Sequence, residues 1–115
     1  MVVDTAHNKE GLTIVLKQLS NETFNSLHIV LGMVSDKNLA RIVPLFPKAA
    51  QYYFCAPQIS RALPVKKLME TAHEFELEGN SYKSVKEAYR VALTSAEKND
   101  LIFVGGSTFV VAEVL

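Results

Sequence analysis

The chain has 115 residues, 49% hydrophobic and 21% charged, so its length and composition fit one globular domain with one core. Twelve basic and twelve acidic side chains leave a formal net charge of zero, which gives no electrostatic footprint for nucleic acid or an anionic membrane surface. No apolar run approaches the roughly 20 residues of a membrane-spanning helix, and no basic signal-peptide start is present. We therefore expect a cytoplasmic protein without nucleic acid or membrane partners.

Apolar runs rich in β-forming residues predict strands along the chain. They lie at residues 2–3, 27–31, 51–55, 74–77 and 101–104. We expect the first run to be the stub of a first central strand. Both chain ends interrupt a pattern, so we expect that Met1 is not the native start and that the natural polypeptide continues upstream.

Helical patterns separate the first three apolar runs. One helix face is predicted by the i, i+3, i+4, i+7 spacing of Leu12, Val15, Leu16 and Leu19. The same spacing returns from Leu39 to Phe46, where Pro44 and Pro47 predict a short or kinked helix.

Three more helices are predicted after residue 60. Pro64 suits the first turn of a helix, because its missing N–H would be unpaired there. Ser84 and Glu87 have the spacing of a capping box, and an apolar face continues to Ala96. Ser107 can cap a last helix towards Val114.

Strands that alternate with helices and are apolar throughout indicate a mainly parallel sheet that is buried on both faces. The prediction is an α/β fold: a Rossmann-like three-layer domain, with a mainly parallel sheet and helices on both faces, over residues 1–115.

Ligands of such sheets bind beyond the carboxyl ends of the strands, where loops meet helix N-termini. The segments expected there are 4–8, 32–37, 56–61, 78–80 and 105–108, and they contain most of the polar and glycine residues. Asp4 could contact a ribose hydroxyl or metal-bound water, or cap a helix. His7 can donate to a carboxylate or phosphate, and Asn8 can cap a helix or bind a ligand. Ser107 follows two glycines, which suits either a carboxylate site or a capped turn.

Other polar residues have simpler explanations when each is taken alone. Asp36 and Lys37 fit a solvated pair beside Ser35, and Arg61 fits a surface charge before a proline. His28, inside an apolar strand, and His73, near a helix end, are interpreted as structural. The lone cysteine, Cys55, cannot form an intramolecular disulfide, and its apolar surroundings predict buried packing in a reducing compartment.

Ready-made nucleotide and metal motifs are absent from the sequence. It has no G-x-x-x-x-G-K-[ST] phosphate loop and no G-x-G-x-x-G after a strand. No His and Cys spacing typical of a metal site occurs either, so we expect no metal site in this chain. If ATP is used, another part of the protein must hold most of it.

Four short blocks together resemble one known family. They are residues 4–8 (DTAHN), Gly32-Met33 with Asp36-Lys37, Arg61 to Pro64 (RALP), and Gly106-Ser107. In this order and spacing they resemble the C-terminal domain of folylpolyglutamate synthases and dihydrofolate synthases, whose wider relatives are the Mur ligases. The resemblance covers essentially the whole chain, although each block is short.

The resemblance implies an ATP-dependent ligase in which ATP phosphorylates a folate or dihydropteroate carboxylate and glutamate then attacks the acyl phosphate. Asp4 and Asn8 would contact ATP, and His7 and Ser107 would hold glutamate. Ser35, Asp36, Lys37 and Arg61 would line the cleft. In that family an upstream ATPase domain of the same polypeptide holds most of the ATP and Mg²⁺, so this chain alone would be inactive.

The sequence departs from the family pattern at Thr5, where glycine is usual, and at Lys9, where proline is usual. Gly105 and Thr108-Phe109 also vary the last block, and these changes bear on backbone geometry near the proposed contacts.

Two other functions stay open. One is the C-terminal domain of a Mur-type ligase of peptidoglycan precursors, against which residues 61–64 favour the folate branch. The other is a small α/β binding module, favoured if the isolated domain bound a ligand tightly without an ATPase domain.

Overall fold

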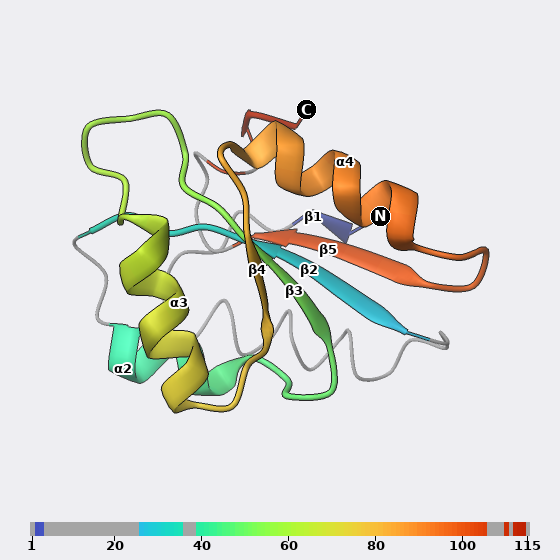
Figure 1. The fold of residues 1–115 in the computed structure, drawn as a ribbon, viewed down its shortest axis with the longest axis horizontal. Helices are drawn as coiled ribbons and strands as arrows, with labels where there is room; N and C mark the ends of the chain where they lie inside the picture. The colour runs from blue at the N-terminus through green and yellow to red at the C-terminus, as the bar shows by residue number, and fades with distance from the viewer. Residues whose placement is uncertain (1, 4–25, 36–38, 106–109, 111, 115) are drawn as a thin grey trace.

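Parallel strands form one sheet through the centre of the protein (Figure 1). The computed structural model describes residues 2–3, 26–35, 39–105, 110 and 112–114. Within these residues the sheet has five strands in the order β1-β5-β2-β3-β4, every pair parallel. The strands are β1 (Val2–Val3), β2 (Leu27–Leu31), β3 (Gln51–Phe54), β4 (Gly79–Ser81) and β5 (Leu101–Gly105).

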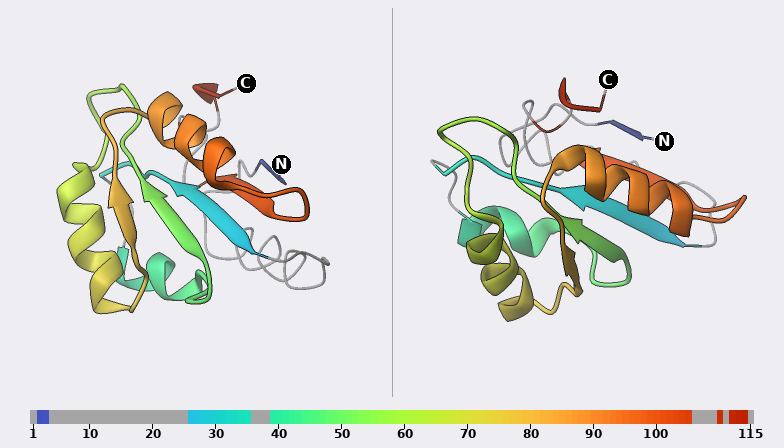
Figure 2. Two further views of the ribbon diagram at one scale, coloured as in Figure 1. Left: turned by 45° about the vertical axis from the view of Figure 1, so that its right-hand side comes forward. Right: turned by 45° about the horizontal axis from the view of Figure 1, so that its top comes forward.

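Helices cover both faces of this sheet (Figure 2). On one face lie α2 (Leu39–Ile42), the 3₁₀ turn η1 (Val43–Leu45) and α3 (Val65–Glu74). On the other face lies α4 (Val85–Ser95). The predicted Rossmann-like three-layer α/β domain is therefore confirmed.

Burial on both faces follows from the alternation of side chains along each strand. In β2, Ile29 and Leu31 pack into the core beneath α2 and α3, while Val30 packs beneath α4. In β5, Phe103 points to the first core and Val104 to the second. Because neither face of the central strands is exposed to solvent, the sequences of these strands are continuous apolar runs.

Local sequence explains where the helices begin. Pro64 immediately precedes α3, and its carbonyl accepts from the N–H groups of Lys67 and Leu68. The predicted cap of α4 is confirmed, since Ser84 Oγ accepts from the N–H of Glu87 at 3.1 Å. The predicted short helix after Leu39 is also confirmed, because α2 gives way to η1 where Pro44 falls.

The strand predicted at residues 74–77 is wrong. Glu74 ends α3, and Glu76 has φ 65°, the left-handed conformation that often ends a helix. The N–H of Leu77 donates to the carbonyl of Ala72, so its apolar side chain closes the helix and packs in the core. The strand is instead β4, which overlaps the segment 78–80 that we expected to be a loop and extends to Ser81.

The sequence does not predict β4, because it begins with Gly79 and glycine is depleted in strands. A Cβ at this position would collide with the backbone of Tyr52 on β3. Glycine is therefore required where the two strands approach closely.

A second prediction, that Val2–Val3 forms a central strand, is also wrong for the described sheet. The last strand, β5, enters between β1 and β2, so β1 lies at the edge. The helix predicted from Leu12 to Leu19 lies outside the described residues, as do residues 107–109 and 111 of the last predicted helix.

Candidate ligand-binding edge of the sheet

The loops that follow β2 and β3 are joined beyond the carboxyl ends of these strands. The N–H of Ser35 donates to the carbonyl of Arg61 at 2.7 Å, and that of Leu63 donates to Met33 at 2.8 Å. Val34 and Ala62 form an antiparallel bridge between them. Ser35 and Arg61, which the sequence analysis assigned to a cleft, are thus neighbours with exposed side chains.

Beneath these loops three strand ends converge on Gly32. Its N–H donates to the carbonyl of Gly105 at 3.4 Å. A Cβ on Gly32 would lie 2.9 Å from both the Cys55 carbonyl oxygen and Val110 Cγ2. Only glycine allows this approach without a shift of its neighbours, so it sets how closely the strand ends and Val110 pack.

Cys55 lies in this convergence and is fully buried. Its Sγ lies 3.5 Å from the Leu31 carbonyl oxygen. Burial, and secondarily the charge of Glu113, raises the pKa of the thiol to about 12. The thiol is therefore neutral at physiological pH, and the interpretation of Cys55 as packing is confirmed.

A cavity opens where the loop after β3 meets the start of α4 and residues 112–113. It is lined by Gln58, Ser84, Lys86, Ala112 and Glu113. The N–H of Gln58 donates to Glu113 Oε2 at 2.6 Å, which ties the two segments together. Lys86 adds a cationic group and Glu113 an anionic one, so this rim suits polar ligands or a polar partner surface.

Gln58 belongs to the segment 56–61 predicted at the carboxyl edge, but no individual role was predicted for Gln58, Lys86 or Glu113. Gln58 and Glu113 lie 55 positions apart, and no local pattern announces a contact between them. The fold brings the loop after β3 to the C-terminal segment and so joins these residues in one cavity.

Six predicted site residues lie outside the described part of the chain. They are Asp4, His7, Asn8, Asp36, Lys37 and Ser107. Their assignments to ATP, glutamate or the cleft remain predictions. Among the described residues, no three His, Cys, Asp or Glu side chains are grouped so that they could hold a metal ion.

The two histidines interpreted as structural differ in their surroundings. His28 is 3% exposed and hydrogen-bonded through both ring nitrogens. His73 is exposed in the last turn of α3, beside a shallow opening that Glu76, Glu78 and Gly79 also line. In the described part of the chain, no helix is long and apolar enough to cross a membrane.

A parallel α/β sheet whose joined loops form a polar carboxyl edge is the architecture of a ligand-binding domain. Residues 1–108 match the family described as Mur ligase, glutamate ligase domain, and the chain belongs to this family. A probable bifunctional folylpolyglutamate synthase/dihydropteroate synthase of Haloferax volcanii is 30% identical over 98% of the chain.

Solved structures resemble the fold closely. Escherichia coli FolC in complex with DHPP and ADP has a TM-score of 0.86 at 25% identity, over 97% of this chain. A bifunctional folylpolyglutamate synthase/dihydrofolate synthase with Mn, AMPPNP and L-glutamate bound also gives 0.86 at 25% identity, over 96%. The predicted resemblance to the C-terminal domain of these synthases is therefore confirmed.

The chain spans only part of these proteins. It corresponds to 14% of the length of the Haloferax protein and to 27% of each of the two solved chains.

Proposed function

We propose that this chain is the C-terminal glutamate-ligase domain of a larger ATP-dependent enzyme that joins glutamate to a folate or dihydropteroate carboxylate. The observation that supports it most is family membership over residues 1–108, together with a fold shared with FolC. The reaction transfers the γ-phosphoryl group of ATP to the acceptor carboxylate. The glutamate amine then attacks the acyl carbon, phosphate leaves and an amide forms.

The described carboxyl edge offers groups that suit anions. The guanidinium of Arg61 can donate to a phosphate or carboxylate, and the hydroxyl of Ser35 lies on the neighbouring loop. Neither group is a preferred ligand for Mg²⁺, which favours carboxylates and phosphate oxygens. The proposal therefore assigns most of the ATP and Mg²⁺ binding to an upstream ATPase domain of the same polypeptide.

Within the proposal, Asp4 and Asn8 contact ATP, and His7 and Ser107 hold glutamate. Ser35, Asp36, Lys37 and Arg61 line the cleft that faces the upstream domain. Related structures hold the same kinds of ligand, since Escherichia coli FolC binds ADP and a bifunctional synthase binds AMPPNP and L-glutamate. The work of this domain is then to bind and orient the amino acid and to close over the nucleotide, in a cytoplasmic enzyme.

The first test is ATP hydrolysis by the full-length protein, with glutamate and one of three acceptors: dihydropteroate, tetrahydrofolate or a muramyl precursor. We expect glutamate-dependent phosphate release with a pteroyl acceptor and none from the 115-residue chain alone. Release only with the muramyl precursor would move the domain to peptidoglycan synthesis. Silence with all three, combined with tight ligand binding by the isolated chain, would instead indicate a binding module.

A second test separates the residue roles in the full-length protein. Asp4→Ala should raise the KM for ATP more than that for glutamate, and Ser107→Ala should do the reverse. Arg61→Ala should lower kcat/KM by about tenfold or more, because a charged hydrogen bond to substrate contributes roughly 1.5–3 kcal/mol. Arg90→Ala, at an exposed residue of α4, is the matched control and should leave kcat/KM unchanged. Equal losses for both substrates in the first two variants would contradict the assignments.

A further inference from the structure

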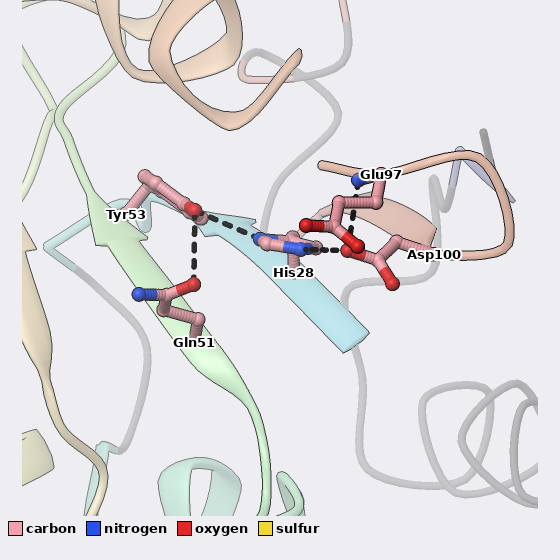
Figure 3. Close-up of polar contacts among 5 residues, drawn as sticks. All are labelled: His28, Gln51, Tyr53, Glu97 and Asp100. Atoms are coloured by element: carbon pink, nitrogen blue, oxygen red, sulfur yellow. Dashed lines mark hydrogen bonds and ion pairs between the residues drawn. The ribbon is translucent and has the colours of Figure 1, made fainter. Parts of the chain in front are cut away.

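A buried polar network lies at the amino ends of the strands, opposite the carboxyl edge described above (Figure 3). His28 Nδ1 lies 2.8 Å from the hydroxyl of Tyr53, and His28 Nε2 lies 2.8 Å from Asp100 Oδ2. The side chains of His28 and Asp100 are only 3% and 7% exposed. The hydroxyl of Tyr53 also lies 3.4 Å from Gln51 Oε1. The proposed ligase function uses none of these groups.

Proton positions on the histidine ring follow from its neighbours. Asp100 Oδ2 also accepts from the N–H of Glu97 at 2.9 Å. This backbone bond first, and the His28 bond second, lower the pKa of the Asp100 carboxyl. Asp100 is therefore ionised at neutral pH and can only accept, so His28 Nε2 must carry a hydrogen in every charge state of the ring.

The other ring nitrogen faces a partner that can both donate and accept. Burial raises the pKa of the Tyr53 hydroxyl, so this group keeps its proton throughout the physiological range. When the ring is neutral, Nδ1 has no hydrogen and Tyr53 must donate to it. When the ring is cationic, Nδ1 carries a hydrogen and Tyr53 must accept.

When the bond to His28 reverses, the Tyr53 hydroxyl must donate its proton to another oxygen. The Ser95 hydroxyl is within hydrogen-bonding reach, and so is Gln51 Oε1. Its 3.4 Å separation is long for an O–H···O bond, which prefers 2.5–3.0 Å. The present geometry thus fits a hydroxyl that donates to His28, with Gln51 available as an alternative acceptor. Buried polar groups are costly when unpaired, so such an alternative matters.

We propose that His28, Tyr53 and Gln51 form a two-state hydrogen-bond relay in the sheet, whose direction reverses when His28 binds a proton. Asp100 is the fixed acceptor in both states and the counter-ion in the cationic state. The device is a proton-binding site that keeps every member paired in either charge state. The relay groups lie on β2 and β3, and Asp100 lies just before β5, so protonation of the ring is coupled to the pairing of these three strands.

Few other groups of the described residues face this relay. The ring of Tyr82 lies 5.9 Å from that of Tyr53 and the Ser95 side chain, at the end of α4, reaches the Tyr53 hydroxyl. The Glu97 side chain belongs to an exposed residue, and only its backbone N–H contacts Asp100. Asp100 is therefore the one ionised partner of the ring among the described residues.

The direct test is ¹⁵N NMR of the histidine ring in this chain between pH 8 and pH 5. At pH 8 we expect the Nε2–H tautomer, with Nδ1 accepting a hydrogen bond. On acidification Nδ1 should gain a proton while Nε2 keeps its own. An Nδ1–H tautomer at pH 8 would overturn the proposal, as would a ring that stays neutral at pH 5 in the folded protein.

Stability measurements on matched variants test the linkage. In Asp100→Asn the amide oxygen still accepts from Nε2, so the neutral ring stays paired, but the counter-ion is gone. Without the counter-ion, His28 binds a proton more weakly in the folded variant than in the unfolded variant. The stability of the folded variant must therefore fall as pH falls. Between pH 8 and pH 5.5 we expect the folding equilibrium of this variant to weaken by about tenfold relative to wild type.

Gln51→Met keeps the side-chain length and removes one of the two alternative acceptors, so it is made in a Ser95→Ala background that removes the other. The double variant should match Ser95→Ala at pH 8 and become less stable than Ser95→Ala at pH 5.5. The His28→Gln background should abolish the extra pH dependence of Asp100→Asn and of the double variant. Parallel stability curves for wild type, Asp100→Asn and the double variant from pH 8 to pH 5.5 would show that the ring is not the proton-binding site.

Discussion

The reactivity of single residues in this domain depends more on how far each side chain is buried than on which amino acid it is. Cys55 and His28 are both reactive side chains by nature, yet one is an inert packing group and the other is held by hydrogen bonds on both nitrogens. Burial favours the neutral thiol, whereas an ionised neighbour and a hydroxyl satisfy the imidazole. Arg61 is the contrasting case, since its exposed side chain stands where loops meet at the carboxyl edge.

Cys55 gives a prediction at this scale. With the pKa of the thiol raised to about 12 and no solvent exposure, the folded protein should react with a thiol-specific reagent at pH 8 at least roughly a hundredfold more slowly than the denatured chain. Following the absorbance of the released reagent checks this. Similar rates in the folded and denatured states would mean that the site opens readily.

At the scale of elements, helix ends follow local sequence, but helix burial depends on the partner face. Ser84 caps α4 as predicted, and Pro64, which was predicted in the first turn of α3, is the residue just before that helix. The stabilisation of each helix comes mainly from its apolar face on the sheet. Leu68 on α3 is completely buried against the first core, whereas Leu93 on α4 is 50% exposed.

These two leucines make a matched pair. Leu68→Ala should lower the free energy of unfolding by about 2–5 kcal/mol, because it leaves a cavity in a packed core. Leu93→Ala is the same substitution in an exposed helical position and should change it by about 0.5 kcal/mol or less. Urea unfolding followed by circular dichroism measures both. Equal losses would contradict the packing of α3 on the sheet.

At the scale of the whole molecule, strand order decides which parts are most protected. β2 pairs with β5 on one side and β3 on the other, so it lies inside the sheet. β4 pairs with β3 only, among the described strands, and its three residues are largely exposed. The centre of the domain is therefore built by segments far apart in the chain.

Amide hydrogen exchange tests this arrangement. The N–H groups of Ile29 to Leu31 should exchange only through global unfolding, because they are buried between two strands. The amides of β4 should exchange at least about tenfold faster, through local opening at the sheet edge. Equal protection of both strands would show that β4 is covered or that the domain opens as one unit.

Most of the fold was predictable because its signals are local. Continuous apolar runs marked β2, β3 and β5, and the capping box marked the start of α4. The predicted strand at 74–77 is wrong because the apolar side chains of Phe75 and Leu77 pack at the end of a helix and do not belong to a strand. The actual strand, β4, has no apolar pattern that could reveal it. Of the candidate site, only the adjacency of Ser35 and Arg61 can be compared with the structure, and the fold does bring them together.

The sequence alone determined the α/β class, the start of each described helix of two turns or more, the burial of Cys55 and the resemblance to the synthases. These properties depend on periodicity, capping residues and short motifs, which are written within a few positions of one another. Tertiary structure alone decided the strand order, the link between Gln58 and Glu113, and the pairing of His28 with Asp100 across 72 positions. Such contacts form because packing brings distant segments together, and no local pattern of residues encodes which ones will meet.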